Sequence, residues 1–127
     1  MIFRNFIWKL HKFALSLQPN YIKKGKEMRK TFKEIISDFD AHLQKSNKKY
    51  YSDFYIGITN DVQRRLFTEH NVDKDNAWWI YREAIDKKTA QLVEEHYLNE
   101  GMEGDTGGGT NDSTYVYCYE IMSTTKE

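Results

Sequence analysis

Three short segments rich in aromatic and β-branched residues alternate with two segments of helical periodicity along this chain. The first kind, residues 50–59, 77–83 and 115–122, predicts strands, because such side chains fit a half-buried pleated surface. The second kind, residues 60–70 and 86–100, has the apolar spacing of amphipathic helices. This order predicts a small α/β domain with a sheet of about three strands flanked by helices.

Sequence signals also mark where these helices start and stop. Asn60 is expected to cap the first helix, with Gln63 three residues later completing a capping box. Gly101 is expected to end the second helix, because glycine adopts the left-handed conformation readily. Gly57 interrupts the first strand, where a glycine indicates that another group approaches the backbone closely. A glycine-rich loop, residues 104–113, leads to the last strand.

Two further apolar stripes at helical spacing precede the first strand. One lies within residues 1–17 and the other runs over residues 28–43, so two extra amphipathic helices are predicted there. We therefore expect a basic helical region, residues 1–46, followed by an α/β domain, residues 47–123. The first helix either packs on the domain or, being basic and amphipathic, lies on a membrane surface or serves as a targeting segment.

Composition narrows the class of protein. With 127 residues and no apolar run long enough for a bilayer, we expect one cytoplasmic domain without stable membrane association. The single cysteine, Cys118, excludes an internal disulfide and a cysteine-based zinc site. The net charge of zero hides a split, because residues 1–50 carry 12 lysines and arginines against 4 acidic residues. Either the basic half binds nucleic acid or the two halves neutralise each other. A natural start at Met28 would make residues 1–27 dispensable.

Two charged residues fall on apolar helical faces and therefore need a partner. Arg65 shares the apolar face of its helix, whereas Arg64 is rotated by about 100° toward solvent. Arg65 either binds a phosphate through its planar guanidinium or pairs with Glu69 or Glu94. Glu94 lies within the apolar stripe of the later helix, where an unpaired carboxylate costs several kcal/mol. It is therefore the partner of Arg65 or a ligand of a divalent cation such as Mg²⁺.

Four separated motifs occur in an order that resembles a known family. A resemblance to the YIG strand and the following helix of GIY-YIG nucleases rests on Phe54-Tyr55-Ile56-Gly57-Ile58-Thr59-Asn60-Asp61, Arg64-Arg65-Leu66 and His70. The A-x-x-x-E helix of that family is similar to Ala90-Gln91-Leu92-Val93-Glu94. Its glycine-rich turn and closing strand are similar to Gly107-Gly108-Gly109 and Tyr115-Val116-Tyr117. The resemblance covers roughly residues 50–122.

Membership of that family would imply a DNA endonuclease that hydrolyses phosphodiester bonds with Mg²⁺, or with another divalent metal such as Mn²⁺. By the resemblance, Tyr55 is the YIG tyrosine, which acts as a general base or positions water. Arg65 is then the catalytic arginine, Glu94 the metal ligand, and His70 a histidine near the scissile phosphate. The residues expected to bind substrate are Gly57, Thr59 and Asn111.

One motif of the family is missing. Its first tripeptide, Gly-Ile-Tyr, lies on a strand that precedes YIG and forms a hairpin with it, and this chain has only Tyr50 and Tyr51 there. Tyr51 is therefore a candidate for the missing catalytic tyrosine. If neither residue replaces it, the alternative is a non-catalytic module of the same fold that binds nucleic acid or protein.

Overall fold

A computed structural model of the chain describes residues 29–105 and 110–127. The helices and strands of this part are α2 (Phe32–Leu43), the short 3₁₀-helix η2 (Tyr51–Asp53), β1 (Phe54–Thr59), the π-helix η3 (Gln63–Glu69), β2 (Trp79–Glu83), α3 (Lys87–Glu100) and β3 (Tyr115–Glu120). The predicted alternation of strands and helices is confirmed, and so is the small α/β class. The helix predicted within residues 1–17 lies outside the described residues.

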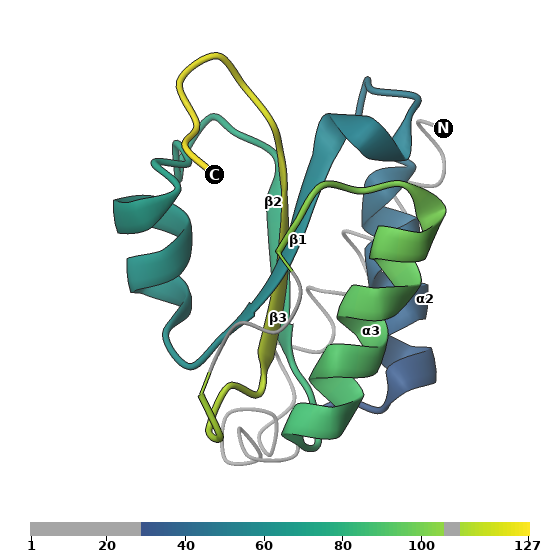
Figure 1. Ribbon diagram of the computed structural model, residues 1–127. Helices are drawn as coiled ribbons and strands as arrows, with labels where there is room; N and C mark the ends of the chain where they lie inside the picture. Colours follow the sequence, from purple (N-terminus) through teal and green to yellow (C-terminus); the bar gives the residue numbers. More distant parts are fainter. Residues whose placement is uncertain (1–28, 106–109) are drawn as a thin grey trace, which may run out of the picture.

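The three strands form one antiparallel sheet in the order β1-β3-β2, so the last strand of the chain lies between the other two. Tyr117 of β3 stands opposite Gly57 of β1 on one side and Tyr81 of β2 on the other. Helices cover both faces of the sheet: η3 packs on one, and α2 and α3 pack together on the other (Figure 1). This leaves β1 as an edge strand with helices on both sides of it.

Side chains alternate between the two faces, and each face has its own hydrophobic core. The core under α2 and α3 is mainly aliphatic and includes Ile35, Phe39, Phe54, Ile56, Ile58, Ile80, Val93, Tyr97, Val116 and Cys118. The core under η3 is rich in phenols and consists of Tyr55, Val62, Leu66, Val72, Tyr117 and Tyr119. The three tyrosines of this second core come from neighbouring strands, which places their rings side by side.

The helix α2 is part of the folded unit. Thr31 caps it through a capping box, in which Glu34 accepts a hydrogen bond from the Thr31 backbone N–H (3.0 Å). Ile35 and Phe39 are completely buried, and Phe39 stacks on Tyr97 with ring centroids 5.8 Å apart. The second predicted amphipathic helix is therefore confirmed, and it shares a core with the sheet. The division of the chain at residue 46 stays a prediction.

The strands are shorter than predicted. The prediction that the first strand includes residues 50–53 is wrong, because the Asp53 N–H donates to the Tyr50 carbonyl (3.0 Å) and the chain turns into η2. The second strand begins at residue 79 instead of 77, and the third ends at residue 120 instead of 122. As a consequence, Tyr50 and Tyr51 precede the sheet and do not belong to it.

The start of η3 also differs from the prediction. Asn60 and Gln63 do not form a capping box; the Asp61 carboxylate accepts a hydrogen bond from the Arg64 backbone N–H instead (3.1 Å). The His70 N–H donates to the carbonyl of Arg65, five positions earlier in the chain (2.9 Å). This is the hydrogen-bond pattern of a π-helix. A single turn of this wide helix therefore joins Arg65 to His70.

The helix α3 matches its prediction closely. The Asp86 side chain caps it by accepting from the Thr89 backbone N–H (2.8 Å). Gly101 ends it in the left-handed conformation, with φ of 118°. Within residues 29–105 and 110–127, none of the helices has the length and apolar character needed to cross a membrane.

Replacing Gly57 should disturb the contact between β1 and β3. A Cβ atom at Gly57 would lie 2.5 Å from Cζ of Tyr117, whose side chain is buried and has little room to move. We expect Gly57→Ala to lower the free energy of unfolding by about 1–3 kcal/mol in urea denaturation. Ser52→Ala, at an exposed position, should change it by less than about 0.5 kcal/mol. Equal effects of the two substitutions would show that the contact is unimportant.

Candidate functional site

A cleft of about 260 Å³ opens at the outer edge of β1. Glu103 covers the first half of this edge, because its N–H donates to the Phe54 carbonyl (2.9 Å) and its carbonyl accepts from the Ile56 N–H (2.9 Å). The cleft lies beside the second half of the strand, from Gly57 onward. Its other walls come from η3, α3, β3 and the loop before β3, and they include Arg64, Arg65, Glu69, Glu94, Asp105, Thr110, Ser113 and Tyr117.

Arg65 reaches the cleft from η3 with 33% of its side chain exposed. Its guanidinium pairs with Glu69 (Nη1–Oε1 2.5 Å), and Arg64 pairs with the other oxygen of the same carboxylate (Nε–Oε2 2.9 Å). The sequence allows Glu69 or Glu94 as the partner of Arg65, and the structure shows Glu69. The hydrogen bond from Arg65 holds the pKa of the Glu69 carboxyl below its usual value. Because one carboxylate serves two guanidinium groups, donors remain for an anion in the cleft.

Glu94 faces the cleft from α3 and is almost fully buried, with 4% of its surface exposed. No described residue forms a hydrogen bond or ion pair with its carboxylate. Because no fully buried side-chain oxygen among these residues lacks a partner, the carboxylate oxygens open onto the cleft. Burial raises the pKa of Glu94 to about 7, and the negative charges of Glu95 and Asp105 add to the shift. An unpaired carboxylate in this position is stabilised by any cation that reaches it.

The groups around Glu94 fit a hydrated divalent cation. Asp105 lies on the same cleft and is close enough to Glu94 to raise its pKa. In the part of the chain that the structure describes, no three histidine, cysteine or acidic side chains are placed so that together they could hold a metal ion. Mg²⁺ suits such a site, because it keeps several waters and needs only one or two carboxylates in addition to substrate oxygens.

Two tyrosines line the cleft from adjacent strands. Tyr55 of β1 and Tyr117 of β3 are both buried, and their rings stack with centroids 6.4 Å apart. Burial raises the pKa of each phenol, while the positive charge of Arg65 acts in the opposite direction. The Arg65 guanidinium is therefore near the Tyr117 phenol. Gly57 makes room for the Tyr117 ring.

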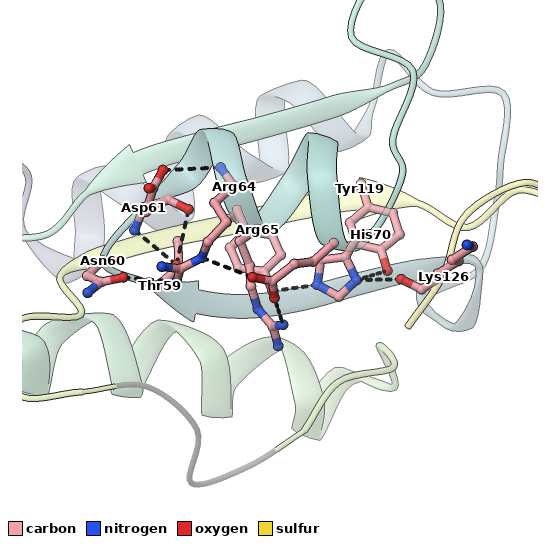
Figure 2. Close-up of polar contacts among 10 residues, drawn as sticks. Thr59, Asn60, Asp61, Arg64, Arg65, His70, Tyr119 and Lys126 are labelled. Atoms are coloured by element: carbon pink, nitrogen blue, oxygen red, sulfur yellow. Dashed lines mark hydrogen bonds and ion pairs between the residues drawn. The ribbon is translucent and has the colours of Figure 1, made fainter.

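His70 lies behind Tyr117 and does not line the cleft. Its side chain is buried, with Nε2 2.8 Å from the Tyr117 hydroxyl and Nδ1 2.6 Å from the Lys126 carbonyl. Figure 2 shows Arg65 toward the cleft end of this group of side chains, and Tyr119 and Lys126 beside the histidine at the other end. Burial lowers the pKa of His70. Its place near a scissile phosphate stays a prediction, and it meets the cleft-lining residues Tyr117, through a hydrogen bond, and Tyr55, through a ring contact of 4.7 Å between centroids.

Two other predicted site residues lie apart from this group. Tyr51 packs near Tyr97 of α3, with ring centroids 6.5 Å apart, and lines a separate groove between α2 and η2. It is therefore not brought next to Arg65. Asn111 is exposed in the loop before β3 and does not line the cleft; residues 110 and 113 of the same loop do. By contrast, Tyr55, Gly57, Thr59, Arg65 and Glu94 all meet at the cleft.

Sequence reasoning missed Tyr117 and Asp105. Tyr117 was placed in the closing strand but given no role at the site, because the neighbours of a strand cannot be deduced from local pattern. Asp105 lies at the start of the glycine-rich loop, where a carboxylate has no periodic signal. Both residues reach the cleft because β3 inserts next to β1 and residues 102–105 run along the β1 edge.

Comparison with known proteins adds no relative to this chain. No protein-family model matches it, and neither the curated proteins nor the solved structures contain a significant match. The chemical interpretation of the cleft therefore depends on the residues that line it.

The raised pKa of Glu94 predicts a specific dependence of stability on pH. In the unfolded chain this carboxyl titrates near 4.5, and in the folded protein near 7, so the folded state binds more protons between these values. The free energy of unfolding should therefore fall as pH rises from 4.5 to 7. Glu94→Gln should remove this fall and be more stable than the native chain at pH 8 by about 1–3 kcal/mol.

Urea denaturation in EDTA at pH 5 and pH 8 measures this difference. Glu100→Gln is the matched control, because Glu100 lies on the same helix but is exposed. If the native chain loses no stability between pH 5 and pH 8, or if Glu94→Gln loses as much as Glu100→Gln, the raised pKa of Glu94 is contradicted.

Proposed function

We propose that this protein is a divalent-cation-dependent DNA endonuclease of the GIY-YIG type, which hydrolyses phosphodiester bonds at the β1-edge cleft. The observation that carries the proposal is the meeting of Tyr55, Arg65 and Glu94 at one cleft, although they lie on three different elements. Each supplies a group that phosphodiester hydrolysis requires. These are a phenol that accepts a proton from water or positions it, a cation for the phosphate, and a carboxylate for the metal.

Arg65 is the group that would hold the scissile phosphate. A guanidinium presents several donors in one plane and binds two oxygens of a phosphate at once. Glu69 fixes the orientation of this guanidinium without burying it, since a third of the side chain stays exposed. Arg64 pairs with the other oxygen of Glu69 and would be a second, more exposed cation beside the phosphate.

Glu94 is the residue that would hold Mg²⁺, with Asp105 beside it. The cation, when bound, would neutralise charge on the phosphate and lower the pKa of coordinated water. Its binding would also keep Glu94 ionised below pH 7, against the effect of burial. Metal affinity and Glu94 ionisation are therefore coupled in this proposal.

Tyr117 is a better candidate than Tyr51 for the second tyrosine of the site. In a GIY-YIG domain the first tripeptide lies on a strand that forms a hairpin with the YIG strand. In this chain the strand that runs antiparallel to β1 is β3, which comes from the far end of the sequence and carries Tyr117 opposite Gly57. Tyr117 would thus take over the role of the missing tyrosine, while Tyr55 keeps the role of the YIG tyrosine.

The proposal predicts nicking of supercoiled plasmid by the full-length protein with Mg²⁺ or Mn²⁺, and none with EDTA. Glu94→Gln should abolish nicking because it removes the cation-binding carboxylate. Arg65→Ala should lower the cleavage rate by roughly 100-fold or more, the usual effect of losing one group that stabilises transition-state charge. Agarose-gel time courses of supercoiled, nicked and linear DNA measure these rates.

Arg64→Ala is the matched control for Arg65→Ala, because both residues pair with Glu69 but Arg64 is more exposed. It should cost less than about tenfold, as expected for an exposed cation. Arg65→Lys keeps the charge and loses the planar fork, so its rate should lie between those of Arg65→Ala and the native chain. Binding of DNA without cleavage under any divalent metal would contradict the proposal and favour a non-catalytic binding module.

A further inference from the structure

The chain after β3 folds back over the end of η3. The Lys126 backbone N–H donates to the His70 carbonyl (2.8 Å), and the Asn71 side-chain amide donates to the Thr124 carbonyl (3.0 Å). A turn from Met122 to residue 125 precedes these contacts. We call residues 122–126 the tail clasp. It attaches to the main-chain carbonyl of His70 and to the side chain of Asn71, and the C-terminus lies beside η3 (Figure 1).

The tail clasp determines which ring nitrogen of His70 carries the proton. The Lys126 carbonyl, 2.6 Å from Nδ1, can only accept a hydrogen bond, so Nδ1 carries the proton. A neutral imidazole has one N–H, which leaves Nε2 as an acceptor. Burial lowers the pKa of His70 and favours this neutral form. The Tyr117 hydroxyl, 2.8 Å from Nε2, must then donate to it.

The remaining polar neighbours are consistent with this assignment. Tyr119 places its hydroxyl 3.0 Å from Nδ1, where it can share the Nδ1 proton with the Lys126 carbonyl. Arg65 lines the same cleft and has only donors, so the side of the phenol that faces it favours lone pairs over the proton. The Tyr117 hydroxyl therefore accepts from the cleft side and donates to the histidine side.

We propose that the tail clasp is a positioning element of the cleft: the Lys126 carbonyl holds His70 in the Nδ1–H tautomer, so that His70 Nε2 accepts the Tyr117 proton and the phenol lone pairs face the cleft. Its catalytic consequence rests on the proposed nuclease function. The tautomer itself does not, because it follows from contacts that involve no substrate. In the opposite tautomer Nε2–H would donate to Tyr117, and the phenol proton would point toward the cleft in place of the lone pairs.

The proton balance of hydrolysis follows from this arrangement. An attacking water gives a proton to the Tyr117 oxygen as the phenol proton passes to His70 Nε2. The water oxygen bonds to phosphorus, the bond to the leaving oxygen breaks, and that oxygen takes a proton from solvent. His70, now an imidazolium that still donates from Nδ1 to Lys126, returns its extra proton to solvent through Tyr117. One water is consumed for each bond cleaved.

The test compares Lys126→Pro with Lys126→Ala in the full chain. Proline removes the N–H that binds the His70 carbonyl, whereas alanine keeps the whole backbone and loses only the side chain. Nitrogen-15 NMR of the histidine ring distinguishes protonated from unprotonated ring nitrogens, and His70→Gln identifies the His70 signals. The native chain and Lys126→Ala should show protonated Nδ1 and unprotonated Nε2. Lys126→Pro should show a mixture of tautomers.

A second variant covers the case in which the backbone adjusts to the proline and the Lys126 carbonyl stays in place. A chain that ends at residue 122 lacks the carbonyl altogether, and its His70 should also lose the single tautomer while the circular-dichroism spectrum stays native. In plasmid nicking, Lys126→Pro should lower kcat by roughly 10- to 100-fold relative to Lys126→Ala with little change in KM, within the range of lost general-base assistance.

The outcomes separate this proposal from the nuclease function. An unchanged Nδ1–H tautomer in both Lys126→Pro and the shortened chain would overturn the role of the clasp, even if the protein cleaves DNA. A native chain with protonated Nε2 would overturn it as well. Loss of the tautomer in a native-like variant, in a protein that cleaves no DNA, would support the clasp and contradict the nuclease function alone.

Discussion

The ring of Tyr117 lies over Gly57 on the neighbouring strand, and the arrangement of the cleft depends on this contact. Only a residue without a Cβ admits the phenol at this point, because an added carbon would meet its ring atoms at 2.5–2.9 Å. With the ring in place, Tyr117 lines the cleft together with Arg65, and its hydroxyl contacts His70 on the other side. The pairing of β1 with β3 thus places Tyr117 between the cleft and the His70 side chain, which contacts the tail clasp.

The charges around the cleft are incompletely neutralised, which favours the binding of charged ligands over the stability of the folded chain. Arg64 and Arg65 share the single carboxylate of Glu69, so positive charge is incompletely neutralised on one wall. On the opposite wall, Glu94 is buried with Asp105 nearby and without a cationic partner among the described residues. A phosphate would complement the first wall and a divalent cation the second. Until such a ligand binds, the incompletely neutralised charge of both walls lowers the stability of the folded chain.

Helical periodicity was sufficient to predict which charged side chains face inward. It selected Arg65 over Arg64 and Glu94 over Glu95, because neighbours in a helix differ by about 100° and only one can share the apolar face. The helix predicted over residues 86–100 lies within one residue of its observed bounds, and Gly101, which ends it, is a local signal. These are interactions between residues close in sequence, which is why pattern alone can find them.

The remaining features depend on contacts that composition and periodicity do not reveal. Tyr50 and Tyr51 have the composition of a strand, but a backbone hydrogen bond to Asp53 turns them out of the sheet. Tyr117 reaches the cleft only because β3 inserts between β1 and β2 in a register that places it opposite Gly57. Likewise, no local signal connects Lys126 to His70, which are 56 residues apart.

Binding of a paramagnetic cation tests most directly whether Glu94 makes this cleft a metal site. Mn²⁺ added to ¹⁵N-labelled protein broadens the amide signals of residues close to it, without any need for a substrate or for turnover. The signals of Glu94, Asp105 and Gly57 should broaden first in the native chain, and they should stay sharp in Glu94→Gln at the same Mn²⁺ concentration. Equal broadening in both proteins, or broadening confined to acidic residues elsewhere on the surface, would contradict a cation site at the β1 edge.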